Sequence, residues 1–388
     1  MQLPSFDFQS RTRVVSGAGC VERLGELARE LGSGRILLVT DAGLVAAGHV
    51  GRAQRNLEAA GLHVTLFDRA KENPATSCVD DCVAVAKAAS VDTLVGLGGG
   101  SSMDTAKGCN FIFTNGGRMQ EYRGVGKATK PMLPFIAIPT TAGTGSEMQS
   151  AALIADEVTH EKMACLDLKC AARIAILDPE LTLSQPLRVT ACTGIDAIAH
   201  AVETAVTTKR NPLSQRLSAE AFRLCVLAFP EVLRHPQSLN SRVWMQVGAA
   251  LAGAAIEQSM LGAAHAAANP LTAHHGIAHG HAVGLMLPHV VQFNACDPAI
   301  ARAYGELACA AQLTQPDNGL AMAVDRLSSR LQSLLELGGL RRSLGDCGVK
   351  LVDLPRLAVE AAGQWTARFN PRVMTPTDFE RIYTAALA

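Results

Sequence analysis

The chain has no excess of charge of either sign. Among its 388 residues, 35 Lys and Arg residues balance 35 Asp and Glu residues, and the sequence pI is about 7.1. A protein that works mainly on nucleic acid or on an anionic membrane surface usually carries a basic excess. The balance argues against both partners and favours a small-molecule substrate. A hydrophobic content of 48% in a chain of this length is enough to build two domains with separate cores.

The sequence also lacks the segments that direct a protein out of the cytoplasm. Its first ten residues, MQLPSFDFQS, contain no basic stretch followed by an apolar one, and no apolar run reaches membrane-spanning length. The 11 Cys residues are odd in number and dispersed, and they form no C-x-x-C motif. We interpret them as buried or inert thiols of a reducing compartment, assign none of them to a metal, and expect a cytoplasmic protein.

The pattern of apolar residues changes near the middle of the chain. The first half alternates short β-rich segments with alanine-rich helical ones, which is typical of a parallel α/β domain. Beyond Pro186 strand signals almost vanish, and long Ala/Leu segments predict helices. We therefore predict an α/β domain at residues 1–182 and an all-helical domain at residues 183–388, with the boundary inside residues 178–186. Strands are predicted at residues 35–41, 63–67, 93–97 and 135–138, and helices at residues 51–60, 77–89, 241–265 and 300–313.

The first half contains a glycine turn directly after a predicted strand. Residues 91–97 are mostly apolar, three glycines (residues 98–100) and Ser101 follow, and a helix-like segment then begins. Glycines let backbone N–H groups approach a diphosphate, and a helix start favours its negative charge. The pattern is neither G-x-G-x-x-G nor a P-loop, so an ordinary tight turn is the alternative. A second polar glycine loop at residues 139–147, also after a predicted strand, strengthens the dinucleotide interpretation.

Asp41 ends another apolar segment, the predicted strand at residues 35–41. In α/β nucleotide-binding folds an acid at this place binds the ribose 2′-hydroxyl of the cofactor. Asp41 would then repel a 2′-phosphate and favour NAD over NADP. The alternative, about equally well supported by the sequence, is that Asp41 is the N-cap of the next helix.

Four side chains of the second half form a pattern typical of a transition-metal site. Asp196 and His200 are one helical turn apart and therefore project from one face of a helix. His265 ends a predicted helix, residues 269–270 (Asn-Pro) interrupt it, and His279 follows a turn-rich stretch, so the chain can return to the first pair. Three imidazoles and one carboxylate suit Fe(II), Zn(II), Ni(II) or Co(II) better than Mg(II) or Ca(II).

A single His beside an apolar surface is more often a structural hydrogen-bonding residue than a metal ligand. Clustering reverses that preference here, because six of the 11 His residues fall within 25 residues of one another. They are His265, His274, His275, His279, His281 and His289.

Longer motifs, taken in order, resemble the iron-containing (group III) alcohol dehydrogenase family. They extend over nearly the full length of the chain, and several are long enough to make coincidence implausible. The motifs are TDAGLV around Asp41, ENP at residues 72–74, GLGGGSSMDTAK, IPTTAGTGSE, ILDPELTLSQP, GIDAIAHAVE, HGHAVGLMLPHV and NPRVMTPTDFERIY.

This resemblance implies a dehydroquinate synthase-like architecture, in which an α/β dinucleotide-binding domain precedes an all-α domain that holds the metal. It also implies a homodimer or larger homo-oligomer, and Fe(II), with Zn(II) as a substitute, on four ligands. The ligands are Asp196, His200, His265 and His279, and the residues assigned to the cofactor are Asp41, Asn73, Gly98, Gly99, Gly100, Ser101, Asp104, Thr140, Thr141, Thr144 and Lys162.

The chain departs from many members of that family at Asn269, where they carry a second His four residues after the third ligand. An amide can hydrogen-bond a substrate or ribose hydroxyl, but it cannot exchange protons at neutral pH. The proton path would then pass through His275, through His274 or through a water chain. Asn269, His275 and His279 are accordingly the candidate catalytic residues.

Together these features predict a metal-dependent oxidoreductase that transfers hydride between an alcohol and a nicotinamide cofactor, NAD rather than NADP, or reduces an aldehyde or ketone in reverse. Two alternatives remain open. A lyase of the dehydroquinate synthase type also uses NAD and a metal, but its phosphate substrate needs a basic pocket, for which Lys209 and Arg210 are the candidates. A non-catalytic nucleotide or metal sensor would bind NADH without turnover.

Overall fold

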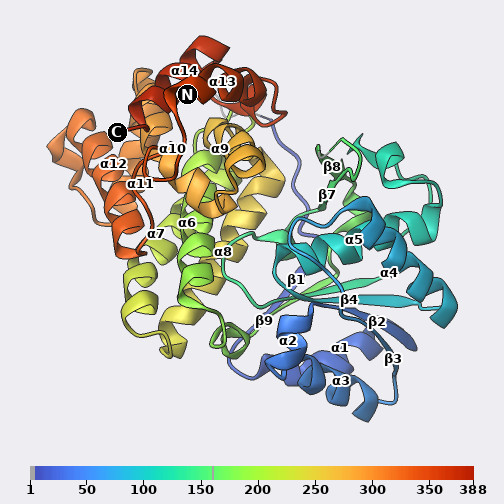
Figure 1. Cartoon of the computed structure of the whole chain (residues 1–388). Helices are drawn as coiled ribbons and strands as arrows, with labels where there is room; N and C mark the ends of the chain where they lie inside the picture. Colours follow the sequence, from blue (N-terminus) through green and yellow to red (C-terminus); the bar gives the residue numbers. More distant parts are fainter. Residues whose placement is uncertain (1–4, 160) are drawn as a thin grey trace. The chain divides into compact units, whose positions relative to one another are not determined.

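The computed structural model describes residues 5–159 and 161–388, and they separate into two compact units (Figure 1). One unit comprises Gln9–Thr141 and Gly145–Ser184, and we call it the α/β unit. The other, the helical unit, comprises Gln185–Ala388 together with Ala142–Thr144 and the described part of residues 1–8. The two predicted fold classes are confirmed. The division after residue 182 stays a prediction.

The α/β unit is built on a six-stranded sheet in which every pair of neighbouring strands is parallel. All four predicted strands belong to this sheet, and two further strands extend one side of it. The order across the sheet is β1 (Arg13–Ser16), β9 (Ile174–Leu177), β6 (Phe135–Pro139), β4 (Thr93–Gly98), β2 (Arg35–Val39) and β3 (His63–Phe67).

Helices cover both faces of this sheet, because successive residues of a strand point to opposite faces. Leu37 and Val39 pack in one core with α4 (Thr76–Ala89) and α5 (Gly100–Asn115). Ile36 and Leu38, the alternate residues of the same strand, pack in a second core with α1 (Leu24–Glu30) and α3 (His49–Ala59). Figure 1 shows these two pairs of helices on opposite sides of the sheet. The short helix α2 (Ala42–Ala46) follows β2.

A second, three-stranded sheet was not predicted. Its order is β5 (Gly124–Val125), β8 (Lys162–Leu166) and β7 (Ala151–Ala155), with β7 and β8 antiparallel. Lys107 of α5 holds the segment 146–151 that leads into β7. Its buried ammonium group donates to the carbonyl oxygens of Ser146, Gln149 and Ala151 at 2.7, 2.9 and 3.0 Å.

The helical unit packs nine described α-helices around one core of mostly Ala, Leu and Val side chains. Within residues 5–159 and 161–388, no single helix is long and apolar enough to cross a membrane; only α8 and α9 taken together, a pair bent by 107°, meet the length and composition test. The helices are α6 (Leu187–Thr204), α7 (Pro212–Arg234), α8 (Leu239–Ser259), α9 (Ala263–His275), α10 (His279–Asn294), α11 (Pro298–Ala310), α12 (Leu320–Leu337), α13 (Leu354–Ala362) and α14 (Pro376–Ala385).

Two local predictions for this unit are wrong. The helix predicted at residues 241–265 is two helices, because Met260 has a positive φ of 67° and ends α8, so His265 lies in the first turn of α9. The predicted interruption at residues 269–270 is absent, since α9 continues through Pro270 to His275. Pro270 removes one intrahelical hydrogen bond without ending the helix.

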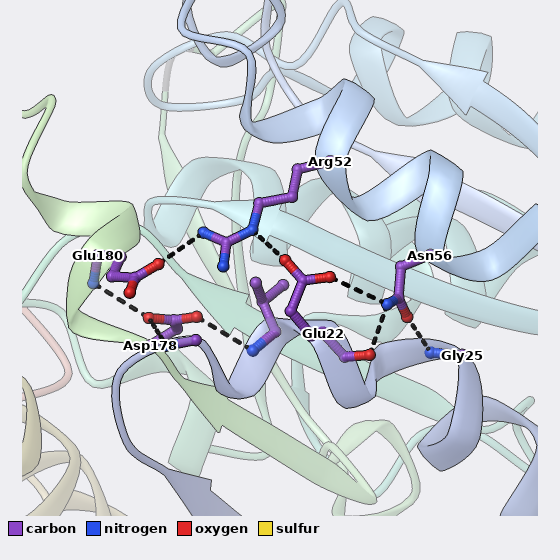
Figure 2. Close-up of polar contacts among 8 residues, drawn as sticks. Glu22, Gly25, Arg52, Asn56, Asp178 and Glu180 are labelled. Atoms are coloured by element: carbon purple, nitrogen blue, oxygen red, sulfur yellow. Dashed lines mark hydrogen bonds and ion pairs between the residues drawn. The ribbon is translucent and has the colours of Figure 1, made fainter. Parts of the chain in front are cut away.

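A polar network joins the segment after β9 to residues 19–25 and to α3 (Figure 2). Asp178 accepts hydrogen bonds at 3.1 Å from backbone N–H groups of the segment 19–21. Arg52 of α3 bridges Glu22 and Glu180, with N···O distances of 2.5 and 2.8 Å. Because these ion pairs are partly exposed, we expect each to contribute well under 1 kcal/mol and the network mainly to set geometry.

Gly25 provides the first stability prediction. Its N–H donates to Asn56 Oδ1 at 2.7 Å, and a Cβ added there would lie 2.6 Å from the carbonyl oxygen of Asn56 and 2.7 Å from Ala60 Cβ (Figure 2). Gly25→Ala should therefore lower the free energy of unfolding by about 1–3 kcal/mol, because α1 and α3 would have to separate. Gly51→Ala on α3 is the matched control, since its Cβ would meet only the flexible end of Arg55. It should be neutral or stabilising by up to about 1 kcal/mol in urea unfolding. Equal effects of the two substitutions would contradict close packing at Gly25.

Glu147 provides a second prediction. Its side chain is buried, and burial raises its pKa to about 7, although the Lys107 ammonium opposes the shift. The folded protein therefore holds a proton that the unfolded chain loses above about pH 4.5, so stability falls as pH rises from 4.5 to 7. The loss should reach about 3 kcal/mol. Glu147→Gln should remove this part of the pH dependence of urea unfolding, whereas Glu157→Gln, at an exposed position, should not. A wild-type curve parallel to that of Glu147→Gln would show that burial leaves the pKa of Glu147 near its ordinary value of 4.5.

Candidate active site

Helix α6 presents Asp196 and His200 from one face, as their spacing predicts. Both residues are buried, with 5% and 4% of their surface exposed, and His200 Nε2 lies 3.5 Å from Asp196 Oδ1. The start of α10 lies against the same helix. A Cβ added at Gly280 would be 2.0 Å from the carbonyl oxygen of Cys192, so only glycine permits this approach. His279, the residue before that glycine, is brought to α6 in this way.

The other two predicted ligands converge on the same carboxylate oxygen. His265 Nε2 lies 3.4 Å and His279 Nε2 4.0 Å from Asp196 Oδ1. One ligand atom from each of Asp196, His265 and His279 falls within 4.8 Å of the others, which makes them a group able to hold a metal ion. The ring of His200 stacks on that of His265, with centroids 4.7 Å apart. Three separate helices therefore contribute to one cluster.

Two buried atoms at the centre of this cluster have no hydrogen-bond partner, namely Asp196 Oδ1 and His265 Nε2. An unpaired buried polar atom is costly, and two of them facing each other call for a third group between them. A divalent cation fits, because it accepts electron pairs from both. The donor set of three imidazole nitrogens and one carboxylate suits Fe(II) or Zn(II).

The charges of the cluster are strongly coupled. Burial alone would raise the pKa of Asp196, but the imidazoles of His200, His279 and His265 outweigh it and hold that pKa below its ordinary value. Burial would likewise lower the pKa of His265, yet the carboxylates of Glu203 and Asp196 raise it to about 9. In His200 burial prevails and lowers the pKa. Positive charge is thus favoured at the centre, as a bound cation requires.

The Nδ1 atoms of two of these rings meet fixed acceptors. His200 Nδ1 lies 3.2 Å from the carbonyl oxygen of Gly143, and His265 Nδ1 makes a very short contact with a carboxylate oxygen of Glu203. Sequence reasoning missed Glu203. Its spacing was the available signal, since it follows Asp196 by seven residues and His200 by three and so lies on the same face of α6.

Asn269 and His275 lie further along α9. Asn269 is one turn after His265, and its amide group donates to Gln364 Oε1 at 2.9 Å. His275 Nε2 is buried without a hydrogen-bond partner, 3.9 Å from a carboxylate oxygen of Asp353. By contrast, His274 is engaged near the surface with Glu360 at 2.7 Å. Of the two neighbouring histidines, His275 therefore has the uncommitted nitrogen.

In the α/β unit, the first predicted glycine loop lies beside Thr140 and Thr141, the start of the second. Gly98 has φ +154°, and a Cβ there would be 2.4 Å from Ser102 Oγ. Thr140 N donates to the carbonyl oxygen of Gly98 at 3.0 Å, and a Cβ on Gly99 would be 3.5 Å from Thr141 Cγ2. Gly99 is the N-cap of α5 and makes no side-chain cap bond, so Gly100 and Ser101 form the first turn of that helix. This geometry suits a diphosphate at the helix start.

The remaining candidates for the cofactor form smaller groups. Lys162 Nζ lies 3.3 Å from Asn73 Oδ1, and Asn73 itself has a positive φ of 51°. Ser146 Oγ donates to Asp104 Oδ1 at 3.2 Å. Burial raises the pKa of Asp104 to about 6, against the opposing charges of Lys107 and Lys162.

Asp41 and Thr144 complete the set. Asp41 follows β2, and its Oδ1 accepts a hydrogen bond from Leu44 N at 3.1 Å, so the N-cap expected as an alternative role is present. Thr144 belongs to the segment Ala142–Thr144 of the helical unit, whereas Thr140 and Thr141 belong to the α/β unit.

Comparisons with known proteins cover nearly the whole chain. A family model for iron-containing alcohol dehydrogenase matches residues 11–179, and a model for the C-terminal part of the Fe-containing alcohol dehydrogenase family matches residues 190–387. The chain is 34% identical over 375 residues to the NAD-dependent methanol dehydrogenase of Bacillus methanolicus, which covers 96% of this chain and 97% of that protein.

Solved structures of similar proteins also match nearly the whole chain. A structure of 1,3-propanediol oxidoreductase has a TM-score of 0.95 and 30% identity, covering 99% of this chain and 100% of that one. The sulfoacetaldehyde reductase of Bifidobacterium kashiwanohense, solved in complex with NAD+, has a TM-score of 0.89 and 26% identity, covering 99% of each chain. The chain belongs to the iron-containing alcohol dehydrogenase family, and it is an oxidoreductase of that family.

Proposed function

We propose that this protein uses a divalent metal and NAD to interconvert an alcohol with the corresponding aldehyde or ketone. The observation that carries the proposal is the pair of unpartnered buried atoms, Asp196 Oδ1 and His265 Nε2, facing each other among three imidazoles. A relative named as NAD-dependent and a structural neighbour solved with NAD+ support the choice of cofactor. Family membership favours the dehydrogenase over the lyase and sensor alternatives.

The metal would be held by Asp196, His200, His265 and His279, as Fe(II) or, in its place, Zn(II). When bound, such an ion supplies Lewis acidity to the oxygen of an alcohol or carbonyl substrate. The surrounding helices bury three of the four proposed ligands, Asp196, His200 and His265. The ligands project from α6, α9 and α10, and their neighbours Ala197, Ala199, Ala266 and Ala267 are fully buried, which excludes water from the protein side of the site.

NAD would be held by the α/β unit. Backbone N–H groups at Gly99, Gly100 and Ser101 would meet the diphosphate, with Thr140 and Thr141 beside them. The paired Lys162 and Asn73 would contact the nicotinamide ribose, Asp41 the ribose of the adenosine half, and Asp104 would complete the contacts of this unit. Thr144, which belongs to the helical unit, is assigned to the cofactor from the family resemblance. When bound, the nicotinamide ring takes or gives the hydride, and the protein's share is to position it and exclude water.

His275 would move the proton that accompanies hydride transfer. Asn269 stands one turn after His265 and cannot exchange a proton, although its amide oxygen can accept a hydrogen bond from a substrate hydroxyl. His275 lies one and a half turns further along α9 and keeps a buried Nε2 without a hydrogen-bond partner. Imidazole is the side chain best suited to carry a proton near neutral pH.

The setting of the enzyme is also part of the proposal. We propose a small-molecule alcohol or aldehyde as substrate and a cytoplasmic homodimer or larger homo-oligomer. All 11 Cys residues are free, which suits a reducing compartment. The oligomer is proposed from the family resemblance.

NADH oxidation with a panel of short aldehydes and oxo acids tests this function. The metal-stripped protein should be inactive, and Fe(II) or Zn(II) should restore turnover. His265→Ala and His279→Ala should each lower kcat by more than about 100-fold, because even groups that only support metal ligands are worth 10–100-fold. NADH binding, followed by fluorescence, should persist. His235→Ala, at an exposed position of the helical unit, should leave kcat unchanged. Metal-independent turnover, or full activity of His279→Ala, would refute the proposal.

Two substitutions at Asp41 separate its two roles. Asp41→Asn keeps an N-cap of similar strength but removes the charge, whereas Asp41→Gly removes both the charge and the side-chain cap. If the carboxylate excludes a 2′-phosphate, both variants should shift the ratio of kcat/KM for NADH over NADPH toward NADPH by at least about tenfold, which is 1.4 kcal/mol. An unchanged ratio in Asp41→Asn would leave Asp41 as a cap alone.

A further inference from the structure

We infer that Glu203 is a positioning residue for the metal. One carboxylate oxygen fixes the His265 ring in the tautomer that presents Nε2 to the ion, and the other anchors the start of the helix that carries this ring. The inference rests on the proposed function, since it concerns how a proposed ligand is held.

Glu203 lies on α6 and is almost fully buried, with 3% of its surface exposed. Its Oε2 makes the very short contact with His265 Nδ1, and its Oε1 accepts a hydrogen bond from the backbone N–H of Ala264 at 2.6 Å. Both oxygens are therefore directed at α9, at two consecutive residues. A buried carboxylate needs such partners.

The contact with Oε2 selects the tautomer of His265. A neutral imidazole carries one proton, and an ionised carboxylate can only accept a hydrogen bond. The proton must then be on Nδ1, which leaves the lone pair of Nε2 free. That atom is the one that lies 3.4 Å from Asp196 Oδ1 and has no hydrogen-bond partner. A carboxylate behind a histidine ligand also makes the ring a stronger donor to a metal.

The contact with Oε1 fixes where the ring stands. Gly262, the N-cap of α9, has no side chain to accept a hydrogen bond from the first turn, so Glu203 supplies the acceptor from another helix. A Cβ on Gly262 would lie only 3.1 Å from Oε1, so a larger residue there would press on this carboxylate oxygen. Because His265 is the third residue of α9, the same anchor sets the position of its backbone.

One helix thereby controls three of the four proposed ligands. Asp196 and His200 project from α6 directly, and His265 is tied to α6 through Glu203. His200 meets a backbone carbonyl, that of Gly143, so its orientation cannot be altered by exchanging a side chain. Glu203 is the position at which the orientation of a ligand can be tested.

Glu203→Gln is the decisive variant. A glutamine can offer its carbonyl oxygen to Ala264 N–H, but its NH2 group then donates toward His265 Nδ1. The imidazole must accept there, and its proton moves to Nε2. We expect the affinity of the metal-stripped full chain for Zn(II) or Co(II), measured by titration calorimetry, to fall about 10–100-fold. In ¹⁵N NMR of the same metal-free protein, labelled at histidine and recorded above about pH 9, where the His265 ring is neutral, the His265 signals should change from the Nδ1–H to the Nε2–H pattern.

A structural role alone would give a different result. If Glu203 only holds the start of α9 in place, Glu203→Gln should lower the melting temperature while metal affinity and the Nδ1–H tautomer of His265 stay as in the wild type. That outcome would overturn the inference. Thr204→Val is the matched control, since Thr204 is the next buried residue of α6, and its hydroxyl bonds to Ser218 and to the backbone carbonyl oxygen of His200, each at 2.7 Å, but to no ligand ring. It should lower stability but leave metal affinity and the His265 tautomer as in the wild type.

Failure of this inference can be told apart from failure of the proposed function. If the wild-type chain bound neither Zn(II) nor Co(II), the proposed metal chemistry would be wrong. If it bound them and Glu203→Gln bound them equally well, only the role of Glu203 would be wrong. The tautomer is read without metal, so an Nδ1–H pattern in Glu203→Gln refutes the inference whichever metal result is obtained.

Discussion

The buried carboxylate of Asp196 is the constraint on which the candidate site depends. A lone ionised carboxylate away from water is costly, and the protein offsets this cost with three imidazoles whose Nε2 atoms lie 3.4 to 4.0 Å from one oxygen. The imidazoles hold the pKa of Asp196 below its ordinary value, yet they leave its Oδ1 without a hydrogen bond. The imidazoles therefore compensate the negative charge of Asp196 but leave one of its oxygens without a bonding partner, as expected for residues arranged around a cation.

Close helix packing brings these side chains together. Gly280 lets α10 approach the carbonyl oxygen of Cys192, and Gly143 lies so close to Thr193 that a Cβ would be 2.5 Å from that residue's Cβ. In both places a larger residue would push a segment away from α6. The small residues of this unit thus determine the positions of the ligands as well as the packing of the core.

The sequence was most informative where a local pattern decides the structure. Strands β2, β3, β4 and β6 are short apolar runs bounded by polar or glycine residues, and Asp196 and His200 need only a helix to share a face. Strand β7 was not predicted, because Ala151–Ala155 is rich in Ala and contains Leu, and both residues are typical of helices. The segment is a strand because it pairs with β8. The same limit applies to Glu203, whose contact with His265 joins residues 62 positions apart.

The break between α8 and α9 shows why the site was only partly predictable. Residues 241–265 favour one long helix by composition, but a continuous helix would place His265 in its last turn. The chain instead turns at Met260, which has a positive φ, and a new helix starts two residues before His265, with the N–H of Ala264 in its first turn donating to Glu203. Helix starts expose backbone donors, so a carboxylate that satisfies one of them can orient a neighbouring ring at the same time.

In the α/β unit, the carboxylate of Asp41 also has two roles, one in capping a helix and one proposed toward the cofactor. Its cap on α2 is satisfied by one oxygen, Oδ1, which accepts from Leu44 N. Asn or Ser would serve nearly as well in that role, so capping explains a small polar residue there but not the choice of a carboxylate. The charge itself stabilises the positive end of a helix by less than about 1 kcal/mol at a surface position. A negative charge at the carboxyl end of β2 would repel a 2′-phosphate more strongly than it stabilises the helix. This difference supports the proposal that Asp41 discriminates between NAD and NADP.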